Sequence, residues 1–188
     1  MPLRVIAGSA RGRKLKTVPG DTTRPILDRV KENLFNILGD WVDGSTWIDL
    51  FAGTGSVGIE ALSRGARHCL FLDTSPQALR VLSENLRSVK LDARATIRRE
   101  DAFHYLRRTP GPADAVELIY VAPPQYRGMW KAVLGILDEQ PDWVLPDGLV
   151  VAQIDPKEYE VLELRHLALM DSRTYGSTML CFYERPGD

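Results

Sequence analysis

The sequence Asp49-Leu50-Phe51-Ala52-Gly53-Thr54-Gly55-Ser56-Val57-Gly58 joins a predicted strand to a predicted helix through a glycine-rich loop. The apolar run 47–51 is typical of a buried strand, and residues 56–64 predict a helix that ends near Gly65. Glycine lets the backbone turn tightly and approach a ligand closely. Such a loop between a strand and a helix is typical of α/β folds that bind a nucleotide-like ligand.

The alternation of strand and helix continues along the chain. Further strands are predicted at 68–73, 95–98, 116–121 and 149–154, and helices at 76–89, 102–107 and 126–137. Repeated strand-helix-strand units give a mainly parallel sheet with helices on both faces. The last two predicted strands, 161–169 and 178–183, have a short connection, so we expect them to be antiparallel. The predicted fold class is therefore α/β with seven strands.

The length of the chain, 188 residues, suffices for one domain with a real core and leaves little room for a second. We predict one domain over residues 1–188, with a basic N-terminal arm or hairpin (1–20) and an α/β core (21–188). Within the core, Thr22-Thr23-Arg24-Pro25 predicts a helix start, because Thr caps helices and Pro suits their first turn. Apolar residues at helical spacing from Ile26 to Leu38 then predict a helix with one buried face. Gly39 predicts the end of this helix.

Composition excludes several classes of protein. No apolar run is long enough to span a bilayer, and the first residues lack the apolar stretch of a secretory signal. We interpret Cys69 and Cys181 as buried thiols of a reducing compartment. We therefore expect a cytoplasmic protein that is not attached to a membrane. No Cys/His cluster has the spacing of metal ligands, so no metal is expected.

Charge is unevenly distributed, although the net charge is only −1. The segment 4–16 carries five cations and no acid, whereas eight acids face the single Lys157 between Asp138 and Glu163. A cationic end on a nearly neutral protein favours a polyanionic partner. A run of charge is also ordinary on a solvated face, so composition alone leaves both interpretations open.

Acidic residues lie at or near the ends of three successive predicted strands: Asp49, Asp73 and Asp101. Strand ends of a parallel sheet meet at one edge, where ligands bind. Asp73 lies about 20 residues beyond the glycine loop, which is the offset expected for a carboxylate that accepts ribose hydroxyls. Asp101 can accept a hydrogen bond from the amino group of adenine, with the Ala102 N–H facing the ring. Asp49 would repel a pyrophosphate but suits the cationic amino-acid end of S-adenosylmethionine, which we predict as the cofactor. Because Gly53, Gly55 and Gly58 also fit the dinucleotide fingerprint, a nucleotide-dependent oxidoreductase remains an alternative.

These motifs resemble the RsmD family of bacterial methyltransferases, which methylate the exocyclic N2 of a guanine in 16S ribosomal RNA. The resemblance covers nearly the whole chain and rests on residues 4–8, 11–15, 24–25, 28–38, 49–61 and 175–178. It implies a Rossmann-like, seven-stranded class I methyltransferase fold and, as partner, ribosomal RNA or a partly assembled small ribosomal subunit. The cofactor residues that the resemblance implies are Asp49, Gly53, Gly55, Asp73 and Asp101, and we predict that Phe51 and Ala102 also contact the cofactor. The resemblance also implies that the N-terminal arm touches RNA, and we predict the contacts to be Arg4, Arg11, Arg13, Lys14, Lys16 and Arg24.

The chain departs from the family in the motif after the fourth predicted strand. Amino methyltransferases of this kind have Asp or Asn, then Pro-Pro, then Tyr or Phe, whereas this chain has Ala122-Pro123-Pro124-Gln125-Tyr126. Acceptors on the N–H groups of an aryl amine localise its lone pair, and an aromatic ring stacks on the flipped base. Ala122 has no acceptor. We predict a catalytic loop of Pro123, Pro124, Gln125 and Tyr126, with the Pro123 carbonyl as main acceptor and Tyr126 as the stacking ring.

Two further hypotheses stay open from the sequence. One is a methyltransferase that acts on another RNA site, on DNA or on a small amine. The other is an RNA-binding relative that keeps the cofactor pocket but has weak or no turnover, because Ala122 replaces the usual acceptor.

Overall fold

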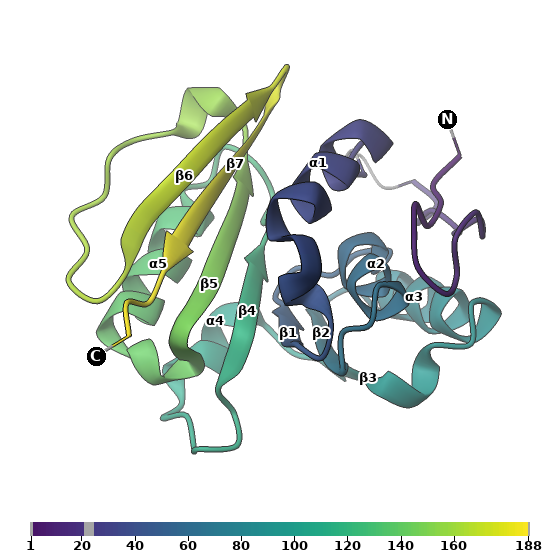
Figure 1. Cartoon of the computed structure of the whole chain (residues 1–188), viewed down its shortest axis with the longest axis horizontal. Helices are drawn as coiled ribbons and strands as arrows, with labels where there is room; N and C mark the ends of the chain where they lie inside the picture. The colour runs from purple at the N-terminus through teal and green to yellow at the C-terminus, as the bar shows by residue number, and fades with distance from the viewer. Residues whose placement is uncertain (1, 21–24, 188) are drawn as a thin grey trace. The chain divides into compact units, whose positions relative to one another are not determined.

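The computed structural model describes residues 2–20 and 25–187, which form two compact units, Met1–Asp101 and Ala102–Asp188 (Figure 1). Seven strands belong to a mixed, mainly parallel sheet, and helices alternate with most of them. The α/β class with seven strands predicted from the sequence is confirmed. In the described ranges, no helix is both long enough and apolar enough to cross a membrane.

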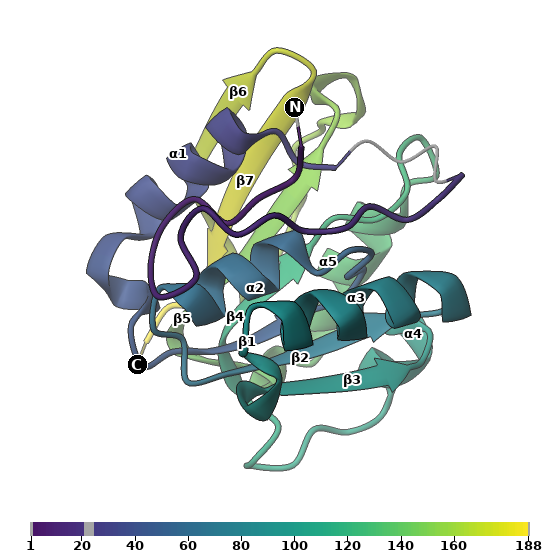
Figure 2. The same cartoon turned by 90° about the vertical axis from the view of Figure 1, so that its right-hand side faces the viewer.

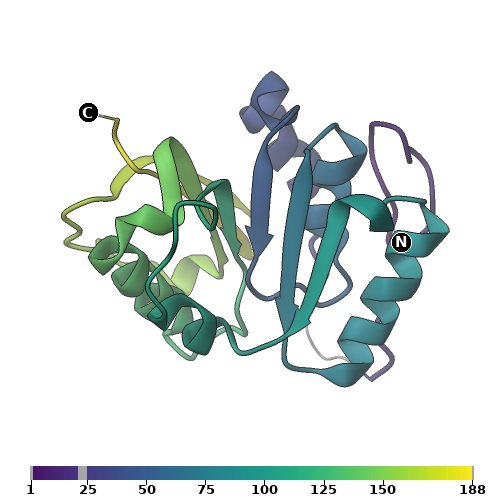
Figure 3. The same ribbon diagram turned by 90° about the horizontal axis from the view of Figure 1, so that it is seen from below.

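The first unit is a parallel sheet with its helices. Its strands lie in the order β3-β2-β1, and Figure 3 shows them side by side and pointing the same way. In chain order its elements are α1 (Asp28–Leu38), η1 (Gly39–Val42), β1 (Thr46–Asp49), α2 (Ser56–Ser63), β2 (His68–Asp73), α3 (Pro76–Ser88), η2 (Asp92–Arg94) and β3 (Ala95–Arg99).

Helix α1 begins at Asp28, later than predicted. Its N-cap is Leu27, which has an extended backbone and no side-chain cap, and Pro25 lies before the helix. Asp28 is an acid in the first turn, where it interacts favourably with the positive end of the helix dipole. The predicted caps Thr22 and Thr23 lie outside the described residues. Helix α3, unlike α1, has a side-chain N-cap, because the Ser75 hydroxyl accepts a hydrogen bond from the Ala78 N–H.

The second unit pairs β4 with β5 in parallel, and β7 with both β5 and β6 antiparallel, in the order β4-β5-β7-β6. The antiparallel final pair predicted from its short connection is confirmed. In chain order its elements are α4 (Ala102–Arg107), β4 (Val116–Val121), α5 (Met129–Glu139), η3 (Pro141–Trp143), β5 (Val144–Ile154), η4 (Pro156–Glu158), β6 (Ala168–Tyr175) and β7 (Thr178–Glu184).

The sixth strand begins at Ala168, so the prediction of a strand over 161–169 is wrong for most of that segment. The Asp138 carboxylate accepts the backbone N–H groups of Arg165, His166 and Leu167, at distances of 2.7 to 3.0 Å. These N–H groups are therefore taken by a side chain from α5 and are not available to a neighbouring strand.

The N-terminal segment folds as a hairpin. Arg4 and Lys14 form an antiparallel bridge, and the Leu15 N–H donates to the Leu3 carbonyl at 2.8 Å. Figure 2 shows this hairpin lying along α2 and α3. The apolar side chains of Leu3, Val5 and Leu15 are buried, so the hairpin adds to the core of the first unit.

Candidate functional site

The glycine loop between β1 and α2 is shaped by two residues with positive φ. Gly55, the N-cap of α2, has φ of 79°, and a Cβ there would lie 2.1 Å from Leu82 Cδ1. A side chain at Gly55 is therefore excluded by both conformation and packing. Gly53 has φ of 53°, but a Cβ there would meet no atom within 4 Å. The loop thus has open space beside Gly53, as a ligand site requires.

Asp49 ends β1 as a buried carboxyl group. Burial first, and the charge of Asp73 second, raise the pKa of Asp49 to about 7. Within residues 2–20 and 25–187, its Oδ1 has no hydrogen-bond partner. A buried carboxylate with an unpaired oxygen favours a cationic ligand group, because such a group would stabilise the ionised form.

Asp73 ends β2 and contacts the glycine loop directly. Its Oδ2 accepts the Gly53 N–H at 2.8 Å, and its Oδ1 accepts the Ser75 N–H at 2.9 Å. Each carboxylate oxygen has a further lone pair, so the group can still accept ligand hydroxyls. Asp73 therefore has a structural role in the loop that sequence reasoning had not assigned to it.

The third strand-end acid, Asp101, lies near Asp73. Asp73 is paired in register with Arg99, and the Glu100 N–H donates to the Asp73 carbonyl at 3.2 Å. Asp101 is exposed, whereas Phe51 in the glycine loop is half-buried. Ala102, the next residue after Asp101, is buried and starts α4. The first unit thus brings three of the predicted cofactor acids to one edge of its sheet.

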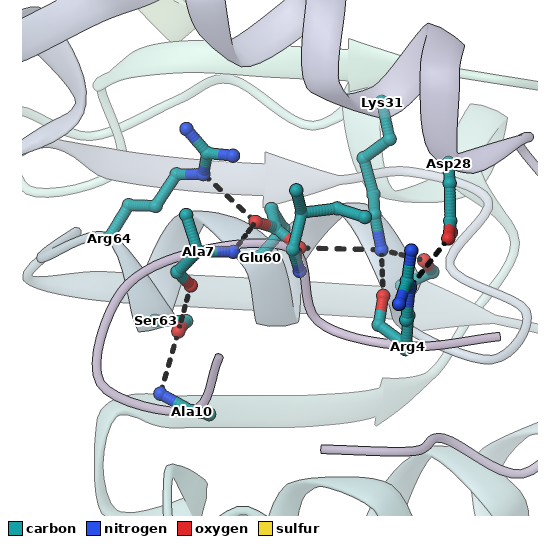
Figure 4. Close-up of polar contacts among 10 residues, drawn as sticks. Arg4, Ala7, Ala10, Asp28, Lys31, Glu60, Ser63 and Arg64 are labelled. Atoms are coloured by element: carbon teal, nitrogen blue, oxygen red, sulfur yellow. Dashed lines mark hydrogen bonds and ion pairs between the residues drawn. The ribbon is translucent and has the colours of Figure 1, made fainter. Parts of the chain in front are cut away.

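The N-terminal hairpin is attached to α1 and α2 through buried charged groups (Figure 4). The ammonium of Lys31 is fully buried and donates to the Arg4 carbonyl at 2.6 Å and to the Ser56 hydroxyl at 3.0 Å. It also pairs with Glu60 Oε2 at 3.3 Å. Burial lowers the pKa of Lys31, against the opposing effect of the Glu60 charge. Ser56 is the first residue of α2, so Lys31 connects the hairpin to the helix that follows the glycine loop.

Two side chains of α2 hold the turn of the hairpin (Figure 4). The Glu60 carboxylate accepts the N–H groups of Ile6 and Ala7 at 2.9 and 3.0 Å. The Ser63 hydroxyl donates to the Ala7 carbonyl at 2.6 Å and accepts the Ala10 N–H at 2.9 Å. The backbone of the hairpin is therefore fixed by side chains of α2, while Arg11, Arg13 and Lys14 of the hairpin are exposed.

Asn85 on α3 connects the hairpin to the glycine loop. Its Oδ1 accepts the Lys16 N–H at 2.7 Å, and its Nδ2 donates to the carbonyls of Lys16 and Thr54, each at 3.0 Å. Asn85 is buried, so these hydrogen bonds are shielded from water. Sequence reasoning missed Asn85, Lys31 and Glu60. A signal existed for the last two, because each is a charged residue within an otherwise apolar helical face.

The predicted RNA-contacting cations differ in their partners. Arg11 and Lys14 are exposed and, among the described residues, make no ion pair. Arg24 lies outside the described residues. The other three have partners: Arg4 pairs with Asp28 at 2.8 Å, Lys16 pairs with Glu84 at 2.8 Å, and the Arg13 guanidinium donates to the Ser88 carbonyl.

In the second unit, the Pro-Pro loop connects β4 to α5. Pro123 is buried, whereas Pro124 and Gln125 are exposed. Tyr126 is 64% exposed and has φ of 61°, a rare conformation for a bulky residue. Trp130, which follows this loop, is buried in α5 and is not available as a surface for a base.

Comparisons with known proteins agree with this architecture. A family model described as Conserved hypothetical protein 95 matches residues 3–184. The YlbH protein of Bacillus subtilis (strain 168) is 39% identical over 186 residues, 98% of this chain and 100% of that protein. Ribosomal RNA small subunit methyltransferase D of Haemophilus influenzae is 30% identical over 183 residues, 97% of this chain and 93% of that protein.

Solved structures also match. The Escherichia coli protein yhhF superposes with a TM-score of 0.87 at 27% identity and covers 100% of both chains. An RNA methyltransferase of Salinibacter ruber, solved with S-adenosyl-L-homocysteine, gives a TM-score of 0.65 over 88% of this chain and 95% of that one. At 16% identity, this second match shows a likeness of fold alone.

The fold is therefore that of the Rossmann-like, seven-stranded class I methyltransferases, as predicted. Within this class, a narrower group is defined by a family model over residues 3–184 and by relatives matched over 100% and 93% of their length. The chain belongs to the RsmD family, and the resemblance found in the sequence motifs is confirmed.

Proposed function

We propose that the protein transfers the methyl group of S-adenosylmethionine to the exocyclic N2 of a guanine in 16S ribosomal RNA. Relatives named Ribosomal RNA small subunit methyltransferase D, matched over 97% and 80% of this chain, support this activity. We infer that the chain acts as one domain, in the cytoplasm and without a metal. Its substrate is ribosomal RNA, free or in a partly assembled small subunit.

The unpaired, buried oxygen of Asp49 carries the assignment of the cofactor. It suits the ammonium of S-adenosylmethionine, because a cation there replaces the missing partner. Asp73 would accept the ribose hydroxyls, and Asp101 with the Ala102 N–H would hold the adenine. The remaining predicted contacts, Phe51, Gly53 and Gly55, line the loop, and the open space beside Gly53 fits a ligand.

The Pro-Pro loop supplies groups for the acceptor amine. The bound cofactor supplies an electrophilic methyl group on a sulfonium. The amino group of guanine is a poor nucleophile, since its lone pair is delocalised into the ring. The Pro123 carbonyl and the Gln125 side chain would accept hydrogen bonds from its N–H groups, Pro124 would shape the turn, and Tyr126 would stack on the flipped base. Direct transfer to nitrogen needs no covalent intermediate on the enzyme.

The hairpin supplies the electrostatic part of RNA binding. Arg11 and Lys14 are the cations best placed to meet phosphates, because a phosphate would displace no protein carboxylate from them. Arg4, Arg13 and Lys16 would exchange the partners that they have in the free protein, and we also assign Arg24 to this set. Each phosphate contact adds affinity that depends on salt.

Methyl transfer from labelled cofactor tests the proposal. Free 16S RNA and partly assembled small subunits are each incubated with the protein, and the modified base is mapped. We expect one N2-methylguanine. Label on DNA or on a small amine alone would assign another substrate. Binding of NADH without binding of S-adenosylmethionine in titration calorimetry would overturn the cofactor assignment in favour of an oxidoreductase.

One observation favours a second function, an RNA-binding protein without turnover. The side chain of Ala122 is a methyl group and cannot accept a hydrogen bond from the amine. If the wild-type protein binds RNA and S-adenosylmethionine but transfers no methyl group, and Ala122→Asn restores transfer, this second function replaces the first.

A further inference from the structure

Tyr126 combines two properties that seldom occur together. Its side chain is among the most exposed large ones of the second unit, and its φ of 61° places it in the left-handed region. Bulky residues adopt this region only where their surroundings impose it.

Two acids that follow β5 impose this conformation. The Tyr126 N–H donates to Glu158 Oε1 at 2.7 Å, and the Tyr126 hydroxyl donates to Asp155 Oδ2 at 2.5 Å. The backbone and the far end of the side chain are thereby both attached to the same short segment, η4. The hydrogen bond with Asp155 also raises the pKa of Tyr126, so the phenol remains a donor.

Asp155 is itself held in place. It is buried at 7% exposure, and its Oδ1 accepts the Lys157 N–H at 2.9 Å, which caps η4. Its Oδ2 is thus directed by the fold, and the Tyr126 hydroxyl donates to an acceptor that does not move freely. The ring between the two attachments remains accessible to solvent.

We propose that Asp155 and Glu158 are positioning residues that fix the ring of Tyr126 as a stacking surface for the target base. This inference rests on the proposed function. Restricting the ring in advance lowers the entropy lost when a base stacks on it. It also explains how the chain functions with Gln125 at the position where the family has an aromatic residue. The left-handed backbone of Tyr126, the next residue, presents the tyrosine ring in its place.

Kinetics on the RNA substrate test the inference. We expect Tyr126→Phe, Asp155→Ala and Glu158→Ala each to lower kcat about tenfold, with an unchanged KM for S-adenosylmethionine. Asp155→Asn keeps an acceptor for the phenol and should restore most of the activity. Because Tyr126→Phe and Asp155→Ala break the same hydrogen bond, the double variant should be no slower than either single one. Tyr159→Phe, which removes a phenol next to η4, is the matched control and should behave as wild type.

A binding measurement separates this inference from the proposed function. A single-stranded RNA with one 2-aminopurine is added with S-adenosylhomocysteine, and quenching of its fluorescence reports stacking. Wild type should quench it, and Tyr126→Ala and Asp155→Ala should not. If wild type transfers no methyl group but shows this pattern, the proposed function fails and the positioning role stands. If Asp155→Ala and Glu158→Ala methylate and quench as wild type does, the positioning role is overturned while the proposed function stands.

Discussion

Replacing Asp49 by asparagine should stabilise the protein and weaken its binding of S-adenosylmethionine. The substitution keeps the shape of the side chain and removes its charge. Burial, with the charge of Asp73, raises the pKa of Asp49 from 3.8 to about 7. This change in proton affinity corresponds to about 4 kcal/mol, since each tenfold change in an equilibrium constant is about 1.36 kcal/mol. We therefore expect Asp49→Asn to raise the free energy of unfolding at pH 8 by about 2–4 kcal/mol, since local relaxation reduces the full value.

The sign of the effect sets its pH dependence. The folded protein retains the Asp49 proton up to about pH 7, whereas the unfolded chain releases it near pH 3.8. Because the folded state binds more protons between these values, this group makes the free energy of unfolding fall as the pH rises through them. Asparagine does not titrate, so the difference between variant and wild type should be small at pH 4 and largest above pH 7.

Urea unfolding at pH 4.5 and at pH 8 measures this difference. Asp92→Asn, at an exposed position on η2, is the matched control and should follow wild type at both values. Titration calorimetry gives the functional half of the prediction. Asp49→Asn should bind S-adenosylmethionine at least about tenfold more weakly, a loss of about 1.4 kcal/mol or more, which is in the range for leaving a polar group unpaired.

Proton release gives an independent check. A cation bound beside Asp49 lowers the pKa of its carboxyl group, so binding to wild type near pH 6.5 should release a proton and weaken as the pH falls. Binding to the variant should show neither effect. The reasoning is refuted if wild type and variant change in stability in parallel between pH 4.5 and pH 8, or if both bind the cofactor equally well.

Three further predictions concern the hairpin and the Pro-Pro loop. Lys31→Met should lower the free energy of unfolding by up to about 3–5 kcal/mol, because the buried Glu60 loses its ammonium and keeps only the guanidinium of Arg64 as a cationic partner. Adding Glu60→Gln should recover part of the loss in the same urea titration. Replacing Arg11 and Lys14 together by alanine should reduce the slope of log affinity for RNA against log salt concentration by about 0.7–0.9 per lost contact. Cofactor affinity should stay unchanged. An unaltered slope would mean that RNA binds at another surface. Ala122→Asn should raise kcat for methyl transfer, because asparagine adds an acceptor for the amine. The gain should be at most about 2.7–4 kcal/mol in transition-state stabilisation, the value for one hydrogen-bond donor of an oxyanion hole. An unchanged kcat would mean that the Pro123 carbonyl suffices.

The first unit was predictable where its structure follows local signals. A strand, three closely spaced glycines and a helix fix the course of residues 49–58, and the positive φ of Gly53 and Gly55 is what such a loop requires. Parallel pairing then brings the ends of β1 and β2 to one edge, so that the placement of Asp49 and Asp73 follows from the alternation of elements.

Features that depend on contacts between distant segments were not predictable in this way. Asp138 on α5 captures three N–H groups of residues 165–167, and no local pattern in either segment announces that contact. The sequence showed that Tyr126 stands one place beyond the family position. Its left-handed backbone depends on Asp155 and Glu158, which are 29 and 32 residues further along the chain.

The hairpin shows how a charged segment gains a fixed position in this fold. A free basic arm loses conformational entropy when it binds RNA, and this loss weakens binding. Here the entropy is already lost on folding, because Lys31, Glu60 and Asn85 bond the backbone of the hairpin from buried positions. Lys31 also contacts Ser56, the first residue of α2, and Asn85 also contacts Thr54 in the glycine loop. Because these two side chains hydrogen-bond the hairpin as well, the fold holds the backbone of the hairpin in one fixed relation to the glycine loop.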